Sequence, residues 1–191
     1  PLSPLHWIIS DRNSSLIVES MKDGLHIHES DLGALTNNPP FKYQIENLQK
    51  FSHLRNDNAN LIRENNLTYE TYSQGLGAVG LPGDVSSMSR FVRIAFGKEN
   101  SVCKNDELSS VGQFFHLLSS VEIIRGNCKN DDGNMHLTYY SSCINTDKGL
   151  YYYTTYNNRR ITCVDMRRTD LDSKNISRFP LISKQSIKYQ N

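Results

Sequence analysis

The stretch Gly75–Phe96, with the sequence GLGAVGLPGDVSSMSRFVRIAF, joins a glycine-rich loop to an amphipathic helix. The loop half carries glycines and a proline that interrupt regular structure. In the second half, apolar residues recur at helical spacing, and Asp84 or Ser86 can cap the first turn. Arg90 lies opposite the apolar stripe. This pattern fits a site that presents an arginine, and it fits equally a surface helix with a solvated basic residue.

The segments before this stretch alternate or cluster apolar residues as short strands do, and turn residues separate them. An antiparallel meander is therefore expected. Pro39 and Pro40 end its last strand, because proline supplies no ladder amide. A helix is expected next, with Phe41, Ile45 and Leu48 on one face. The predicted strands cover residues 5–10, 16–19, 25–29 and 34–37.

The segments after the stretch predict one more helix and a second group of strands. Val111, Phe114, Phe115, Leu118 and Val121 keep helical spacing. The strands that follow are expected at residues 137–140, 150–153, 161–164 and 182–189. Strands, then helices, then strands indicate an α+β fold in which helices cover antiparallel sheets.

Composition places the chain among ordinary globular proteins. It has 191 residues, 37% hydrophobic content and a net charge of +1, so one domain spanning residues 1–191 is expected, and no affinity for nucleic acid is implied. No apolar run reaches the roughly 20 residues that a membrane helix requires. Four widely spaced cysteines lack metal or redox spacing, and we expect reduced thiols.

Three motifs suggest ligands but have simpler explanations. The glycines at 75, 77 and 80 match a dinucleotide-binding pattern, yet Pro82 prevents a helix from opening where pyrophosphate would need one. His26 and His28 share a strand face without a third ligand nearby, so no metal site is expected. The tyrosines 151–153 could line an aromatic surface, although a strand with alternate tyrosines facing core and solvent is the commoner arrangement.

The segment Leu35-Thr36-Asn37-Asn38-Pro39 has two amides at a predicted strand end. A following proline can hold such amides rigidly, so that they steady an oxyanion or orient a nucleophile. The same residues also form ordinary turns at strand ends. Residue types alone leave both interpretations open.

Seven ordered motifs together resemble the choloylglycine hydrolases, which include the bile salt hydrolases and the penicillin V acylases. The resemblance covers the whole chain and is closer to the bile salt hydrolases in several flanking details. The motifs are Leu5-His6-Trp7, Leu35-Thr36-Asn37-Asn38-Pro39, Gly80-Leu81-Pro82-Gly83-Asp84, Ser89-Arg90-Phe91, Gln113-Phe114-Phe115-His116, Tyr140-Ser141-Ser142-Cys143 and Gly149-Leu150-Tyr151-Tyr152-Tyr153.

The resemblance implies the αββα sandwich of an N-terminal-nucleophile hydrolase. The family nucleophile is a cysteine at the mature N-terminus, whereas this sequence begins with Pro1. We therefore expect the sequence to correspond to the later part of a family member, inactive by itself. The resemblance also implies a bacterial, cytoplasmic homo-oligomer, a dimer or a tetramer, without a cofactor.

Two site residues follow from the resemblance. Asn37 matches the family asparagine that positions the reacting centre, and Arg90 matches the arginine that stabilises the charged site. Leu2, beside a substrate loop, is expected to border the pocket. The implied reaction of the intact protein is cleavage of glycine or taurine from conjugated bile salts. The alternatives are a penicillin V acylase-type amidase and a non-catalytic fragment.

Overall fold

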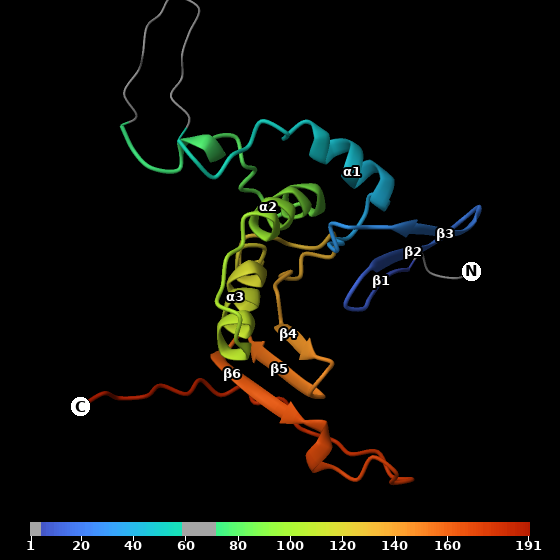
Figure 1. The fold of residues 1–191 in the computed structure, drawn as a ribbon, viewed down its shortest axis with the longest axis vertical. Coiled ribbons are helices and arrows are strands. Elements are labelled where there is room, and N and C mark those ends of the chain that lie inside the picture. The colour runs from blue at the N-terminus through green and yellow to red at the C-terminus, as the bar shows by residue number, and fades with distance from the viewer. Residues whose placement is uncertain (1–4, 59–71) are drawn as a thin grey trace, which may run out of the picture. The chain divides into compact units, whose positions relative to one another are not determined.

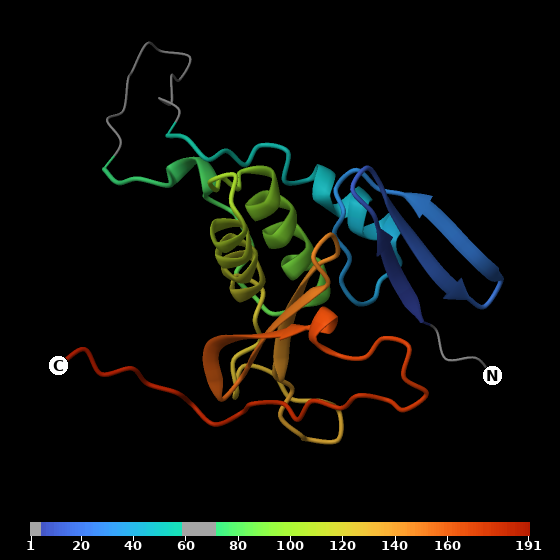
Figure 2. The same ribbon diagram turned by 60° about the horizontal axis from the view of Figure 1, so that its bottom comes forward.

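A computed structural model describes residues 5–58 and 72–191. The chain divides into two compact units, residues 1–101 and 102–191, each with a three-stranded antiparallel sheet and its own helices (Figures 1 and 2). Most of the loop predicted between residues 53 and 72, and Leu2 of the predicted pocket, lie outside the described residues. A single domain over the whole sequence stays a prediction.

The first unit opens with the predicted meander. Its strands are β1 (His6–Ser10), β2 (Ser15–Met21) and β3 (Gly24–Glu29), in the order β1-β2-β3. Registers such as His6 opposite Glu19 and Ile17 opposite His28 place these four side chains on one face of the sheet. This face carries Ile17, which is fully buried in the core of the unit.

The opposite face of this sheet is apolar, and several of its side chains are exposed. Trp7 and Ile9 on β1 and Leu25 and Ile27 on β3 are 45–62% exposed. Their registers with Val18, Leu16, Ser20 and Val18 respectively place them all on the second face. A sheet with helices on one face and an apolar second face is typical of one layer of a sandwich.

Two helices form the rest of the first unit. Helix α1 (Phe41–Gln49) follows the two prolines as predicted, and α2 (Ser87–Glu99) begins at an N-cap Ser86, whose side chain accepts from the Ser89 amide. The core consists of Ile17, Ala34, Phe41 and Phe91, with Leu32, Leu35, Ile45, Leu48 and Ile94 packed against it. Phe41, Ile45 and Leu48 of the predicted α1 stripe and Phe91 of the predicted α2 stripe therefore lie in this core.

The glycine-rich loop serves close packing. A short 3₁₀ helix, Leu76–Ala78, occupies the middle of the glycine pattern, and α2 begins only at Ser87. A Cβ at Gly77 would lie 1.9 Å from the Asp57 carbonyl oxygen, so only glycine fits there. The helix start that a dinucleotide site needs is absent from this part of the described chain.

The second unit packs one helix on a meander. Helix α3 (Glu107–Ser119) covers β4 (Tyr140–Asn145), β5 (Leu150–Thr155) and β6 (Asn158–Asp165), which are ordered β4-β5-β6. Val111, Phe115 and Tyr152 form the core. Tyr152 faces α3, and Tyr153 lies on the other face of the sheet. The tyrosines therefore alternate as predicted, but the face that was expected to be in solvent is covered at Tyr153, which is buried. A second short 3₁₀ helix, Met166–Arg168, follows β6.

Three predicted strands differ from the structure. Residues 34–37 form an irregular loop, because Thr36 Oγ1 donates to the Ser87 carbonyl and the Asn37 carbonyl accepts from Gln44 Nε2 instead of from a neighbouring strand. The strand predicted at 137–140 instead runs from Tyr140 to Asn145, since the turn after Asn145 pairs that residue with Leu150 and fixes the register. Residues 182–189 are irregular, and the Ile182 amide and carbonyl bond the side chains of Tyr153, Thr155 and Asn158.

Candidate functional site

The structure brings Asn37 and Arg90 into direct contact within the first unit. Arg90 Nη2 donates a hydrogen bond to Asn37 Oδ1 over 2.7 Å, although the residues are 53 positions apart. The arginine also donates from Nε to the Val85 carbonyl, 3.1 Å away, just before α2 begins. An arginine only donates, so this contact fixes which end of the Asn37 carboxamide is the oxygen. The Asn37 Nδ2 group therefore points away from Arg90.

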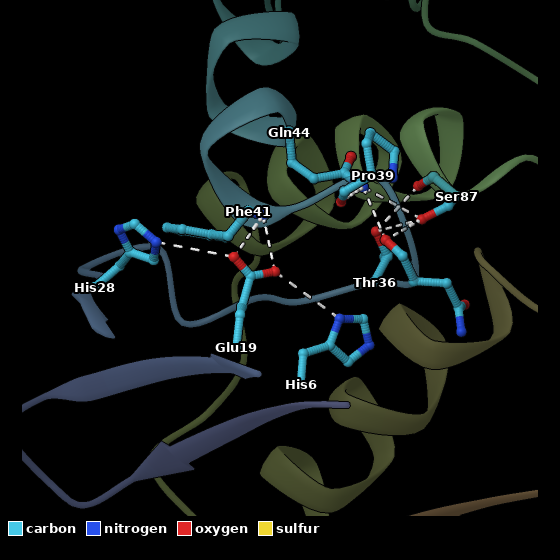
Figure 3. Close-up of polar contacts among 9 residues, drawn as sticks. His6, Glu19, His28, Thr36, Pro39, Phe41, Gln44 and Ser87 are labelled. Carbon is cyan, nitrogen blue, oxygen red and sulfur yellow. Dashed lines mark hydrogen bonds and ion pairs between the residues drawn. The ribbon is translucent and has the colours of Figure 1, made fainter. Parts of the chain in front are cut away.

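The backbone of Asn37 is held as firmly as its side chain. Its carbonyl accepts from Gln44 Nε2 of α1 at 3.0 Å and from Ser87 Oγ of α2 at 2.7 Å. Thr36 Oγ1 donates to the Ser87 carbonyl at 3.1 Å, which ties the same loop to the first turn of α2. Figure 3 shows Thr36, Pro39, Gln44 and Ser87 converging on this loop. Both helices thus position the loop through buried or half-buried polar groups.

A carboxylate on β2 fixes the start of α1, directly after this loop. Glu19 is 3% exposed, and its Oε1 and Oε2 accept from the Phe41 amide at 3.0 and 3.1 Å. Pro40 at the N-cap position has no side chain that can accept, so Glu19 supplies the cap from another element. His6 Nδ1 and His28 Nε2 lie 4.0 and 3.8 Å from the carboxylate (Figure 3).

Asn37 also lines a small polar hollow beside this carboxylate. The hollow has a volume of about 120 Å³ and is bounded by Leu5, His6, Glu19, Ser20, Met21, Asn37 and Asn38. Arg90 is not among these lining residues, and it contacts Asn37, which is. Leu2 lies outside the part of the chain that the structure describes, and its predicted place at the pocket stays a prediction.

The loop before α2 carries a strongly acidic carboxylate. Hydrogen bonds from the Ser86 and Ser89 side chains, and then from the Ser86 amide, lower the pKa of Asp84 to about 2. Arg93 Nη1 donates to the carbonyls of Pro82 and Asp84 at 2.8 and 2.6 Å. The charged Asp84 and Arg93 therefore hold the Gly-Leu-Pro-Gly-Asp motif against the helix that carries Arg90.

The two histidines on β3 lie beside different carboxylates. His26 Nε2 lies 3.1 Å from Asp23 Oδ1, whereas His28 is nearest to Glu19, so the two rings have different carboxylate partners. Among residues 5–58 and 72–191, no three histidine, cysteine, aspartate or glutamate side chains are grouped as metal ligands. The four cysteines are unpaired, and burial raises the pKa of the Cys143 thiol.

Sequence reasoning did not identify Glu19, Gln44 or Ser87 as parts of this arrangement. Glu19 stood in a predicted strand and Gln44 in a predicted helix, where polar residues are usually solvent-facing. Gln44 has no exposed surface. One signal was available: a helix that begins after two prolines, without an acidic residue in its first turn, needs a cap from elsewhere.

Comparison with known proteins identifies the family. Residues 2–179 match the sequence profile of the linear amide C–N hydrolases, choloylglycine hydrolase family. The chain belongs to this family. The bile salt hydrolase/transferase of Lactiplantibacillus plantarum is 47% identical over 96% of this chain and 56% of its own length. That of Clostridium perfringens is 36% identical over 100% of the chain and 58% of its own length.

Solved structures agree with the predicted fold class. A mutant of the conjugated bile acid hydrolase from Clostridium perfringens superposes with a TM-score of 0.87 and 34% identity, over 97% of this chain and 57% of that one. Penicillin V acylase from Agrobacterium tumefaciens gives a TM-score of 0.68 at 22% identity, over 89% of this chain and 48% of that one, and shows the fold alone. The chain has the N-terminal-nucleophile hydrolase fold and spans about half the length of these relatives, from 48% to 58%.

Proposed function

We propose that the complete protein carrying this sequence hydrolyses conjugated bile salts at the amide bond that joins glycine or taurine to the bile acid. The observation that carries this proposal is the contact between Asn37 and Arg90, two residues that match the family's site motifs and lie 53 positions apart. The similarity to bile salt hydrolases over 96–100% of the chain supports the choice of substrate class.

In this proposal the reaction is acyl transfer through a cysteine thiolate. The attacking cysteine belongs to the mature N-terminus of the complete protein, outside residues 1–191. Its sulfur adds to the amide carbonyl carbon, and the carbonyl oxygen takes the negative charge. Collapse of this intermediate breaks the C–N bond, and the leaving nitrogen departs as an amine with the proton that the thiol gave to the α-amino group of the cysteine. Water then cleaves the thioester and releases the bile acid.

Asn37 and Arg90 have separate roles in this scheme. Arg90 occupies Asn37 Oδ1, so the Nδ2 hydrogens are directed away from the guanidinium and can donate to the developing oxyanion. The positive charge of Arg90, one hydrogen bond behind that amide, stabilises negative charge at the reacting centre. The two carbonyl contacts of Asn37 keep this donor fixed before substrate arrives.

The direct test uses the complete protein with a confirmed free N-terminal cysteine. Incubation with glycocholate and taurocholate should release glycine and taurine, measured as free amine. Absence of release would contradict the proposal. A parallel assay with penicillin V, and competition between the two substrates, separates a bile salt hydrolase from a penicillin acylase. Residues 1–191 expressed alone serve as the control for a non-catalytic fragment and should release neither product.

We further propose that the complete protein is a cytoplasmic homo-oligomer, a dimer or a tetramer, acting on a small-molecule substrate without a cofactor. The family resemblance supports this assembly. No helix in the described ranges has the length and apolar character needed to cross a membrane. Light scattering coupled to size-exclusion chromatography measures the assembly, and a monomeric mass would contradict it. Cell fractionation tests the compartment.

A further inference from the structure

Gln44 on α1 contacts the loop that carries Thr36, Asn37 and Pro39, and its side chain is buried there. The residue has no exposed surface. Its Nε2 donates to the carbonyls of Asn37 and Pro39, at 3.0 and 3.1 Å, and lies 3.3 Å from Ser87 Oγ. Carbonyl groups only accept, so the amide must point its nitrogen toward the loop. Figure 3 shows its oxygen turned away from these partners.

That orientation has an energetic cost. Gln44 Oε1 is buried and has no hydrogen-bond donor among the described residues. A buried acceptor without a donor costs about 1–3 kcal/mol relative to a solvated one. An apolar side chain of the same length would avoid this cost, but it would also remove the donor to the Pro39 carbonyl and one of the two donors to the Asn37 carbonyl. The orientation of Gln44 is therefore set by the hydrogen bonds from Nε2 to the loop, which leave Oε1 without a donor.

The contacts of Gln44 converge on the residue that carries the proposed chemistry. With Ser87 Oγ, it occupies both acceptor positions of the Asn37 carbonyl, and through Pro39 it fixes the following turn of the loop. The Asn37 side chain leaves the same α-carbon to meet Arg90 at 2.7 Å. A rotation of the Asn37 peptide would therefore swing its carboxamide away from the guanidinium.

We propose that Gln44 is a positioning residue for amide hydrolysis, which fixes the Asn37 backbone so that the carboxamide of Asn37 stays on Arg90. This inference rests on the proposed function and assigns a role to a residue that touches no reacting atom. Misplacement of a catalytic group by about 1 Å costs up to about a hundredfold in rate. Loss of the Gln44 donor should act on the rate of the chemical step and much less on substrate binding.

The experiment compares the complete protein with its Gln44→Met variant, which keeps the length of the side chain and removes both polar atoms. We expect kcat for glycocholate to fall about ten- to a hundredfold, with KM changed less than about threefold. Tm should change little, because loss of the donors to the Asn37 and Pro39 carbonyls is offset by removal of the buried, unpaired acceptor. Gln49→Met, on the exposed end of the same helix, is the matched control and should leave kcat and KM unchanged.

A double-mutant comparison separates positioning from general damage. If Gln44 acts through Asn37, Gln44→Met should lower kcat about ten- to a hundredfold in the wild-type background and less than about twofold in an Asn37→Ala background. Equal fractional losses in the two backgrounds would overturn the inference. A fall in kcat that is matched by a large fall in Tm would also overturn it.

Crystal structures of the complete wild-type and Gln44→Met proteins supply a readout that does not depend on activity. The inference requires the Asn37–Arg90 contact in the wild type and its loss in the variant. An intact contact in the variant would overturn it. If the wild type releases no amine from bile salts while the variant still loses the contact, the placement of Asn37 by Gln44 is upheld and the proposed function fails.

Discussion

The two units use a carboxylate in opposite ways to join a helix to a sheet. In the first unit, Glu19 on β2 is 3% exposed and caps α1 from the strand side. In the second unit, Glu107 begins α3 and accepts from Asn145, Lys148 and Tyr152 on or beside the strands. The Lys148–Glu107 pair is partly open to solvent. Both carboxylates fix the position of a helix, but Glu19 is the one that lies next to the loop carrying the candidate site residue Asn37.

The hydrogen bonds around the two carboxylates lead to different parts of the molecule. Beside Glu19, which caps α1, Gln44 of the same helix and Ser87 of α2 hold Asn37, and Asn37 contacts Arg90. Around Glu107, the contacts end at the hairpin and at the core tyrosine of the same unit. Changes in the first unit should therefore alter activity, whereas equivalent changes in the second should alter stability alone.

The largest expected difference in activity is between two arginine variants, one in each unit. Arg90→Ala removes the donor to Asn37, so kcat for glycocholate should fall at least about a hundredfold. Arg159 in the second unit pairs with Glu122 at 2.5 Å, and its side chain is 57% exposed. Because exposed ion pairs contribute little, Arg159→Ala should change kcat less than about twofold. Steady-state assays of the complete protein check both, and equal losses would break the comparison.

The next effect concerns the helix cap. Glu19→Ala leaves the Phe41 amide without its acceptor at a buried helix start, so the free energy of unfolding should fall by about 2 kcal/mol. Glu29, an exposed residue of β3, is the charge-matched control, and Glu29→Ala should cost less than about 0.5 kcal/mol. Urea titration measures both. The loss for Glu107→Ala should be smaller than for Glu19→Ala, and the reverse order would contradict the account.

Acid should weaken the first unit through Asp84. Its pKa is lowered from 3.8 to about 2 in the folded protein, because Ser86 and Ser89 donate to it. A lowered folded pKa means that the stabilisation is present above the unfolded pKa and is lost as pH falls through the folded one. Asp84→Asn should therefore remove a stability loss between about pH 4 and pH 2. Acid titrations followed by circular dichroism check this, and identical pH profiles would refute it.

Alkali should produce a smaller effect in the second unit. Burial, followed by the hydrogen bond to Glu107, raises the pKa of Tyr152 from 10.0 to about 12. A raised folded pKa keeps the stabilisation below the unfolded pKa and loses it as pH rises through the folded value. Tyrosinate absorbance should show a late-titrating phenol that disappears in Tyr152→Phe and titrates earlier in Glu107→Gln. An unchanged titration curve in both variants would count against the Glu107 contact.

The parts of the fold that sequence predicted are those encoded by local periodicity. The stripe Met88–Phe96 and the alternation at 25–29 correspond to α2 and β3. The predicted strand at 34–37 is wrong, because Thr36 and Asn37 are held by hydrogen bonds with Ser87 and Gln44 and not by a ladder. Strand β4 lies later in the sequence than the predicted strand at 137–140, because the pairing in a hairpin depends on its turn as well as on the apolar residues.

The sequence predicted the candidate site residues Asn37 and Arg90, but it did not predict the residues that hold them in place. Asn37 and Arg90 were expected from motifs, and the structure places them in contact, while their catalytic roles stay predictions. Glu19 contacts Phe41, which is 22 positions away in the sequence, and Gln44 contacts Ser87, which is 43 positions away. Local sequence patterns describe which face of an element is apolar and carry no information on which distant donor meets a buried acceptor.

The most direct test of the central claim is the rate of glycine release from glycocholate by the complete Asn37→Ala protein. Asn13→Ala, in the exposed turn between β1 and β2, is the matched control. The account predicts that Asn37→Ala lowers kcat at least about a hundredfold at unchanged Tm, while Asn13→Ala retains the wild-type rate. Equal rates for the two variants would contradict the assignment of Asn37 and Arg90 to the amide-cleaving site.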